Sequence, residues 1–133
     1  MATTIQATFE VTDWHEQPVD ETPPASKMTH AHVTKDYAGD VIGSSSQEWL
    51  LAYASDRADA PATFVGLERI RGAVAGREGS VVLRHVGVYA DGVAQADLTV
   101  VPGSGTGALA AVDGTGWFRA DPAGQITLDL TFD

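Results

Sequence analysis

The sequence predicts an all-β fold, a single closed antiparallel barrel of eight strands that takes up all 133 residues. Short runs rich in Val, Thr, Phe, Leu and Tyr recur between Gly, Pro and Asp residues, which is typical of strands joined by turns. Helical spacing of apolar residues is hard to find over windows longer than about ten residues. The chain has no cysteine, so packing rather than disulfides must hold the core together.

Eight runs are predicted as strands. They are Ile5–Thr12, Met28–Tyr37, Gln47–Ala54, Ala62–Arg71, Ser80–Tyr89, Ala94–Val101, Gly114–Ala120 and Gln125–Phe132. Eight antiparallel strands are enough to close a small barrel. Between the first two strands, Glu16–Ser26 holds three of the six prolines and is predicted as a surface loop over one barrel mouth. Asp56–Pro61 is predicted as a polar hairpin connection.

Two glycine-containing segments share the form G-x-Φ-x-small-x-x-G, Gly72–Gly79 and Gly107–Gly114. Each lies between two predicted strands, so we expect the same strand-turn-strand corner to be built twice. The neighbouring run Val101–Gly107 is rich in glycine but has no Gly-Lys-Ser/Thr sequence and no long helix after it. It is interpreted as a tight connection with one helical turn, Thr106–Val112, rather than a phosphate-binding loop.

The charge of the chain argues against several partners. Eight Lys and Arg residues face eighteen Asp and Glu residues, giving a formal net charge of −10. This charge repels nucleic-acid phosphates and anionic membrane surfaces, so neither is expected as a partner. The N-terminus has neither the basic start nor the apolar run of a secretion signal, and the expected location is the cytoplasm.

Several motifs in order resemble a known family. They are Phe64-Val65-Gly66-Leu67-Glu68-Arg69, the glycines at 72, 76 and 79, Val82-Leu83-Arg84-His85-x-Gly87, and Val101–Gly107. Together they resemble the bacterial family known as domain of unknown function thirty-two twenty-four, from about Ala7 to the C-terminus. The resemblance implies an eight-stranded barrel similar to allene oxide cyclase with a cavity along its axis, and it implies no established activity.

Alternation along two strands places a carboxylate and an imidazole in one interior. If the arginines face outward, Glu68 shares the inner face of its strand with Phe64, and His85 shares the inner face of the next strand with Leu83 and Tyr89. Burial would raise the pKa of Glu68 and make it a candidate acid, base or charge stabiliser. The alternative is a structural ion pair of Glu68 with His85 or with Lys35.

Further side chains complete the predicted site. The candidate catalytic residues are Glu68, His85 and Tyr53. The candidate ligand-binding residues are Trp49, Leu51, Phe64, Leu83 and Tyr89. The competing interpretation is that His85 is an ordinary core histidine and that the aromatic residues simply fill a small barrel.

A metal site is not expected. His30 and His32 lie on one face of their strand, but no third ligand follows at a suitable offset and the face looks solvent-exposed. No cofactor is expected either. Apolar residues such as Val65, Leu67, Val86 and Val88 fall on the predicted outer face, which suggests a homodimer or homotrimer.

Three functions follow from these features. The first is binding of a small hydrophobic or amphipathic molecule in the axial cavity. The second is a cofactor-independent isomerase or cyclase, with Glu68 stabilising charge or transferring a proton. The third is an interaction module whose barrel interior is filled.

Overall fold

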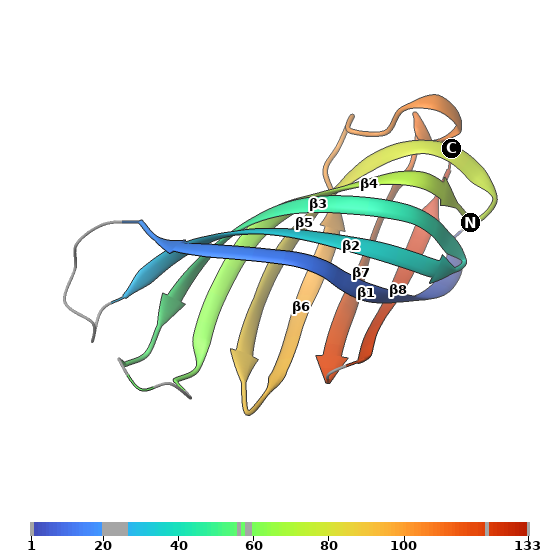
Figure 1. The fold of residues 1–133 in the computed structure, drawn as a ribbon. Coiled ribbons are helices and arrows are strands. Elements are labelled where there is room, and N and C mark those ends of the chain that lie inside the picture. Colours follow the sequence, from blue (N-terminus) through green and yellow to red (C-terminus); the bar gives the residue numbers. More distant parts are fainter. Residues whose placement is uncertain (1, 20–26, 56, 58–59, 122, 133) are drawn as a thin grey trace.

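The strands close into one antiparallel barrel in sequence order, and β1 pairs with β8 to complete it (Figure 1). The computed structural model describes residues 2–19, 27–55, 57, 60–121 and 123–132. The strands are β1 (Thr3–Pro18), β2 (Met28–Gly39), β3 (Val41–Tyr53), β4 (Ala62–Val74), β5 (Arg77–Ala90), β6 (Val93–Val100), β7 (Asp113–Asp121) and β8 (Ala123–Thr131). The predicted eight-stranded all-β barrel is therefore confirmed.

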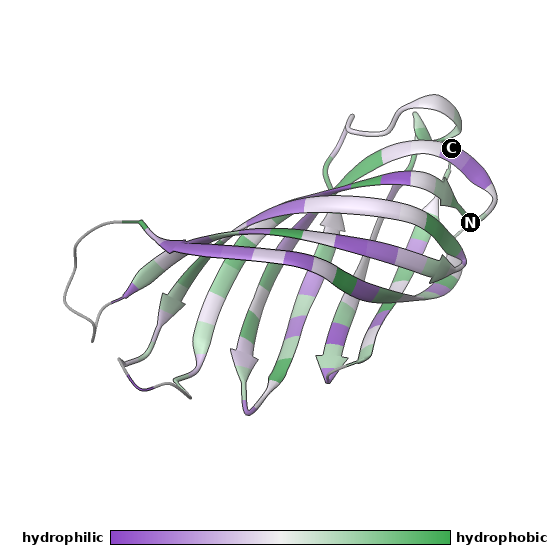
Figure 2. Ribbon diagram, viewed as in Figure 1, coloured by the Kyte–Doolittle hydropathy of each residue, from purple (hydrophilic) through white to green (hydrophobic). Residues whose placement is uncertain are grey.

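Strict alternation separates the interior from the outer surface. On β4, Phe64, Glu68 and Ile70 are buried while Arg69 and Arg71 are exposed. Figure 2 shows the same pattern along the strands as alternating hydrophobic and hydrophilic segments. Every second side chain points inward because the pleat has a period of two residues. The inward phases predicted for this strand and for β5 are correct.

One end of the barrel is plugged by a short element between β6 and β7. The 3-10 helix η2 (Gly107–Leu109) packs over β5, and Leu109 and Val112 are buried in the core. This confirms a single helical turn after the glycine-rich run. The barrel opens at its opposite end, where β1, β3, β5 and β7 finish.

The two glycine segments do not form the same turn. In Gly72–Gly79 a two-residue hairpin turn, Ala75-Gly76, joins β4 to β5 with both residues at positive φ (52° and 76°). The segment Gly107–Gly114 instead contains η2 and then begins β7. The prediction of a duplicated corner was wrong because a shared glycine spacing does not fix the hydrogen bonding between the glycines.

β1 and β3 extend furthest beyond their predicted bounds. β3 begins at Val41 rather than at the predicted Gln47, so Ser44, Ser45 and Ser46 lie in this strand. β1 continues to Pro18, which places the start of the predicted loop Glu16–Ser26 in the sheet. Residues 20–26 of that loop, and residues 56, 58 and 59 of the predicted connection Asp56–Pro61, lie outside the described residues.

A bulge explains how the second half of β1 reaches the interior. The pairing of β1 with β2 shifts between Val11 and Asp13, so that one residue of β1 has no counterpart on β2. Odd-numbered residues such as Phe9 point inward before the bulge, and Trp14 and Glu16 point inward after it. The bulge thereby adds two polar-tipped side chains to the open end of the barrel.

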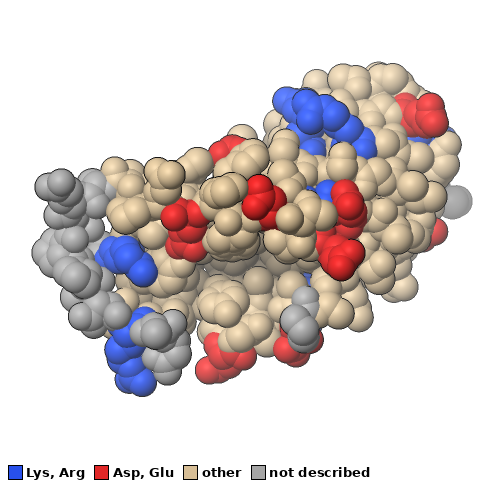
Figure 3. All heavy atoms as spheres, viewed as in Figure 1, with Lys and Arg blue, Asp and Glu red and all other residues tan. Residues whose placement is uncertain are grey.

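Charged groups are distributed over the outer surface, where Figure 3 shows separate acidic and basic clusters on the face in view. No helix formed by the residues with described structure is long and apolar enough to cross a membrane.

Candidate functional site

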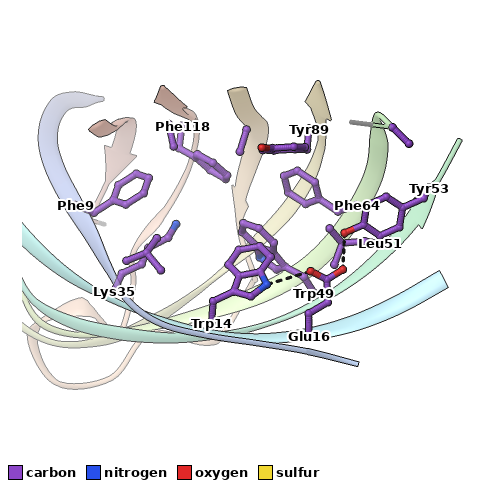
Figure 4. Close-up of a pocket in the computed structure, with 14 residues that line it drawn as sticks. Phe9, Trp14, Glu16, Lys35, Trp49, Leu51, Tyr53, Phe64, Tyr89 and Phe118 are labelled. Carbon is purple, nitrogen blue, oxygen red and sulfur yellow. Dashed lines mark hydrogen bonds between the residues drawn. The ribbon is translucent and has the colours of Figure 1, made fainter. Parts of the chain in front are cut away.

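A cavity of about 390 Å³ occupies the open half of the barrel. Seven of the eight strands and the connection before β4 contribute to its lining. The lining residues are Phe9, Val11, Trp14, Glu16, Lys35, Trp49, Leu51, Tyr53, Ala60, Phe64, Tyr89, Ala94, Phe118 and Ala120. Figure 4 shows the aromatic side chains facing one another across this space. Its volume is in the range that holds a small organic molecule.

The cavity walls are made by aromatic rings in contact. Trp49 stacks on Phe64 with ring centroids 4.5 Å apart, and Trp14 meets Trp49 edge to face at 5.4 Å. Phe9 and Phe118 form a second edge-to-face pair at 5.8 Å. Such pairs fix the orientation of rigid, apolar surfaces. The cavity is therefore a preformed apolar space.

Two glycines make room for these rings. A Cβ atom on Gly66 would approach Cδ1 of Trp49 and the backbone oxygen of Glu48 far inside normal contact, well under 3.0 Å. A Cβ atom on Gly124 would likewise overlap the ring of Phe9. Glycine is thus required at both positions so that the large rings can lie flat against the barrel wall.

The side chain of Lys35 reaches into the barrel from β2 and ends among the aromatic rings (Figure 4). It is 1% exposed, and its Nζ atom has no hydrogen-bond partner among the described residues. Nζ lies 3.9 Å from the ring centroid of Phe9, 4.5 Å from that of Phe118 and 5.8 Å from that of Trp49. The rings stabilise an ammonium through their faces but accept none of its hydrogen bonds as an oxygen would.

Trp49 supplies a second unused donor. Its indole Nε1 is buried and also lacks an acceptor among the described residues, although the residue lines the cavity. Buried N–H groups nearly always have a partner in folded proteins because leaving one unpaired costs free energy. Lys35 and Trp49 both line the cavity, and an acceptor atom on a ligand that reached their two buried nitrogens would satisfy both donors.

Glu16 forms a polar cluster at the cavity mouth. Its Oε1 accepts a hydrogen bond of 3.1 Å from Nε1 of Trp14, and its Oε2 accepts one of 2.6 Å from Thr29 and another from the hydroxyl of Tyr53. Burial raises the pKa of Glu16, but these hydrogen bonds and the charge of Lys27 outweigh it, so the net pKa is lowered. The pKa of Tyr53 rises to about 12 through burial and its bond to Glu16. The mouth thus presents an ionised carboxylate and a neutral phenol.

Glu68 lies one layer deeper, below the cavity. Nε2 of His85 donates to its Oε1 at 2.8 Å, while the hydroxyls of Tyr37 and Ser45 donate to Oε2 at 2.7 and 2.6 Å. Glu68 and His85 are both 0% exposed, and neither lines the cavity. The carboxylate is thus held by three donors from three other strands.

The pKa of Glu68 differs from the expectation. Burial raises it, but the charge of Lys35 and the bonds from His85 and Ser45 lower it to about 2 overall. The prediction of a raised pKa was wrong because the carboxylate is surrounded by donors rather than by apolar groups. Burial lowers the pKa of His85, so its imidazole is neutral at pH 7 and carries its proton on Nε2, the atom that donates to Glu68.

The predicted site residues separate into two groups. Trp49, Leu51, Tyr53, Phe64 and Tyr89 line the cavity together. Glu68, His85 and Leu83 are buried beneath it. The sequence indicated Lys35 only as a partner of Glu68. It did not identify four further lining residues, Phe9, Trp14, Glu16 and Phe118, as part of the site. The alternating pattern of β7 was the one signal that favoured Phe118, whereas the bulge concealed Trp14 and Glu16.

The outer surface carries the remaining predicted features. His30 and His32 are on the outer face, where both hydrogen-bond to Glu48. The described part of the chain contains no group of three or more His, Cys, Asp or Glu side chains placed to hold a metal ion. Val65, Leu67, Val86 and Val88 are 43–52% exposed on β4 and β5. Whether they form a subunit contact stays a prediction.

The fold and the site thus define a closed eight-stranded barrel with an aromatic cavity open at one end. A family model described as a protein of unknown function (DUF3224) matches residues 5–132, so the chain belongs to this family. A similar fold occurs in a crystal structure of a protein with unknown function from the DUF3224 family of Shewanella oneidensis MR-1. That chain is 25% identical, with a TM-score of 0.77 over 100% of this chain and 99% of the other. No curated protein matches the sequence.

Proposed function

We propose that this barrel binds one small, mostly apolar molecule that carries an oxygen acceptor. The apolar body would lie against the aromatic walls, and the oxygen would accept hydrogen bonds from Nζ of Lys35 and Nε1 of Trp49. The observation that supports this proposal is that two residues lining a cavity of about 390 Å³ carry buried donors without partners in the described part of the chain. A ligand oxygen would remove the cost of both unpaired groups.

In this proposal the ligand makes its polar contact with Lys35 and not with Glu68, the residue that the sequence predicted. Glu68 already accepts three hydrogen bonds and does not line the cavity. It supports the site indirectly, because its negative charge raises the pKa of Lys35 against the effect of burial. In this proposal Glu68 and His85 lie beneath the cavity and do not touch the ligand.

An isomerase or cyclase acting in the same cavity is the second proposal. Negative charge that develops on a ligand oxygen would be stabilised by Lys35, whose ammonium faces no carboxylate in direct contact among the described residues. The two proposals differ in whether the ligand leaves unchanged. The third function predicted from the sequence is an interaction module with a filled barrel. The cavity of about 390 Å³ argues against a filled interior.

Two measurements test the binding proposal. Organic extraction of the purified native protein followed by mass spectrometry would identify a retained molecule. A titration then compares decanoate, decan-1-ol and decane by tryptophan fluorescence in the Trp117→Phe variant, in which Trp14 and Trp49 at the cavity are the only tryptophans left.

We expect both oxygen-containing probes to bind at one site more tightly than decane. The difference should disappear in Lys35→Met and persist in Arg69→Met, since Arg69 is exposed on the outer face of β4. Equal binding of decane, or no saturable binding of any probe, would overturn the proposal.

A further inference from the structure

The amine of Lys35 differs from an ordinary buried lysine in its surroundings. Buried ammonium groups are normally paired with a carboxylate or several oxygens. Here Nζ faces three aromatic rings and has no hydrogen-bond partner among the described residues, and it belongs to a residue that lines a cavity. A lysine in such an apolar site is suited to react as a free amine.

We propose that Lys35 is the nucleophile of a carbonyl-binding site and forms a reversible imine with an aldehyde or ketone borne by an apolar ligand. This deepens the proposed function and rests on it, because the ligand must first enter the cavity. The class of ligand narrows from any oxygen acceptor to a carbonyl compound.

The reaction needs no group beyond the amine and the carbonyl compound. The ammonium first gives up a proton to solvent water, and the lone pair of Nζ attacks the carbonyl carbon while the carbonyl π electrons move to oxygen, which takes up a proton from the nitrogen. The hydroxyl of the carbinolamine then takes back the proton held by solvent and leaves as water, while the nitrogen lone pair forms the C=N bond. Overall, one ammonium and one aldehyde give one protonated imine and one water, with the positive charge conserved.

The residues around and beneath Lys35 favour both the attack by the free amine and the formation of the protonated imine. Burial lowers the pKa of Lys35, which increases the fraction of free amine. Glu68 stays ionised through its bonds to His85, Tyr37 and Ser45, so it supplies a negative charge that stabilises the protonated imine. Glu68 acts through its charge and is a positioning residue in this scheme.

Access to the amine is controlled by the rings around it. The Nζ atom is buried, and the nearest ring is that of Phe9. A carbonyl carbon therefore reaches Nζ only when a ring turns aside. Imine formation should consequently be slower than ligand entry.

Reductive trapping tests the proposal on the wild-type protein. Decanal and sodium cyanoborohydride convert an imine to a stable secondary amine, and peptide mapping by mass spectrometry then locates the modified residue. Lys27, Lys35 and the α-amino group are the only primary amines in the chain. Lys27→Arg removes the exposed competitor, and Lys35→Arg keeps a positive charge that cannot form an imine.

We expect Lys35 to be modified at least ~10-fold more than the exposed Lys27, because a bound aldehyde is held beside the amine. Decan-1-ol should suppress labelling of Lys35 and leave labelling of Lys27 unchanged. Labelling confined to Lys27 and the α-amino group, while decan-1-ol still binds, would overturn the imine proposal and leave the binding proposal intact. Absence of both labelling at Lys35 and binding of decan-1-ol would overturn both.

Discussion

Nε2 of His85 donates a hydrogen bond of 2.8 Å to Oε1 of Glu68 in a part of the barrel where neither side chain is exposed. Because His85 is neutral, this contact joins a neutral donor to a buried anion. Among the described residues, the charge of Lys35, which lines the cavity, has the largest lowering effect on the pKa of this carboxylate. The stability of the core and the chemistry of the cavity are therefore coupled through one carboxylate.

The first prediction concerns the stability of this network. Glu68→Gln replaces the anion by an amide, which weakens the bonds from His85, Tyr37 and Ser45 and leaves Lys35 without a counter-charge. We expect the free energy of unfolding to fall by about 3 kcal/mol. Urea denaturation measures this change, with the exposed Glu78→Gln as the control, for which a change within about 0.5 kcal/mol is expected. Equal effects of the two variants would contradict the assigned role of Glu68.

The second prediction is a pH dependence of stability. The pKa of Glu68 is about 2 in the folded protein and 4.5 without the fold, so the unfolded chain binds more protons between these values. The stabilisation is complete above pH 4.5 and is lost as the pH falls toward 2, to a total of about 3 kcal/mol. Urea midpoints across this window should fall more steeply for wild type than for Glu68→Gln. Glu16 and Glu48 are present in both proteins, so their contributions cancel in the comparison.

The third prediction concerns the cavity. Ala94 lines it near the open end, and Ala94→Phe would place a ring in the space that the ligand occupies. We expect the affinity for decan-1-ol to fall at least ~10-fold, a loss of about 1.4 kcal/mol. The control is Ala52→Phe, which puts the same ring on the outer face of β3. Unchanged affinity in a folded Ala94→Phe protein would show that decan-1-ol binds elsewhere.

The regular strands of this barrel were predictable from alternation alone. On β4 and β5 an unbroken period of two, combined with outward arginines, placed Glu68, His85 and Phe64 inside correctly. A pairing of Glu68 with His85 was one of the alternatives that the sequence left open, and the two side chains are hydrogen-bonded. These results depend only on the local pleat and on the preference of arginine for water.

Other features depend on contacts that local sequence does not determine. The bulge after Val11 reverses the phase of β1, and a run of serines lies in a strand because its neighbours β2 and β4 pair with it. The pKa of Glu68 depends on Lys35, His85 and Ser45, which come from three other strands. The register of the closed sheet brings these groups together, and sequence periodicity does not determine how neighbouring strands pair.

The last prediction concerns access to Lys35. The three atoms nearest to a methyl group at position 124 all belong to the Phe9 ring, so we expect Gly124→Ala to displace that ring. The same ring covers Nζ of Lys35 at 3.9 Å. Displacing it exposes the amine and removes one cation–π contact that favours the unreactive ammonium.

We therefore expect Gly124→Ala to trap decanal at Lys35 about fivefold faster than wild type, which corresponds to a barrier lowered by about 1 kcal/mol. The rate is measured by intact-protein mass spectrometry at fixed decanal and cyanoborohydride. Thr8→Ala, on the outer face of β1 beside Phe9, is the control and should leave the rate unchanged. Faster trapping in both variants would indicate general loosening of the barrel, while an unchanged rate in Gly124→Ala would show that Phe9 does not limit access to the amine.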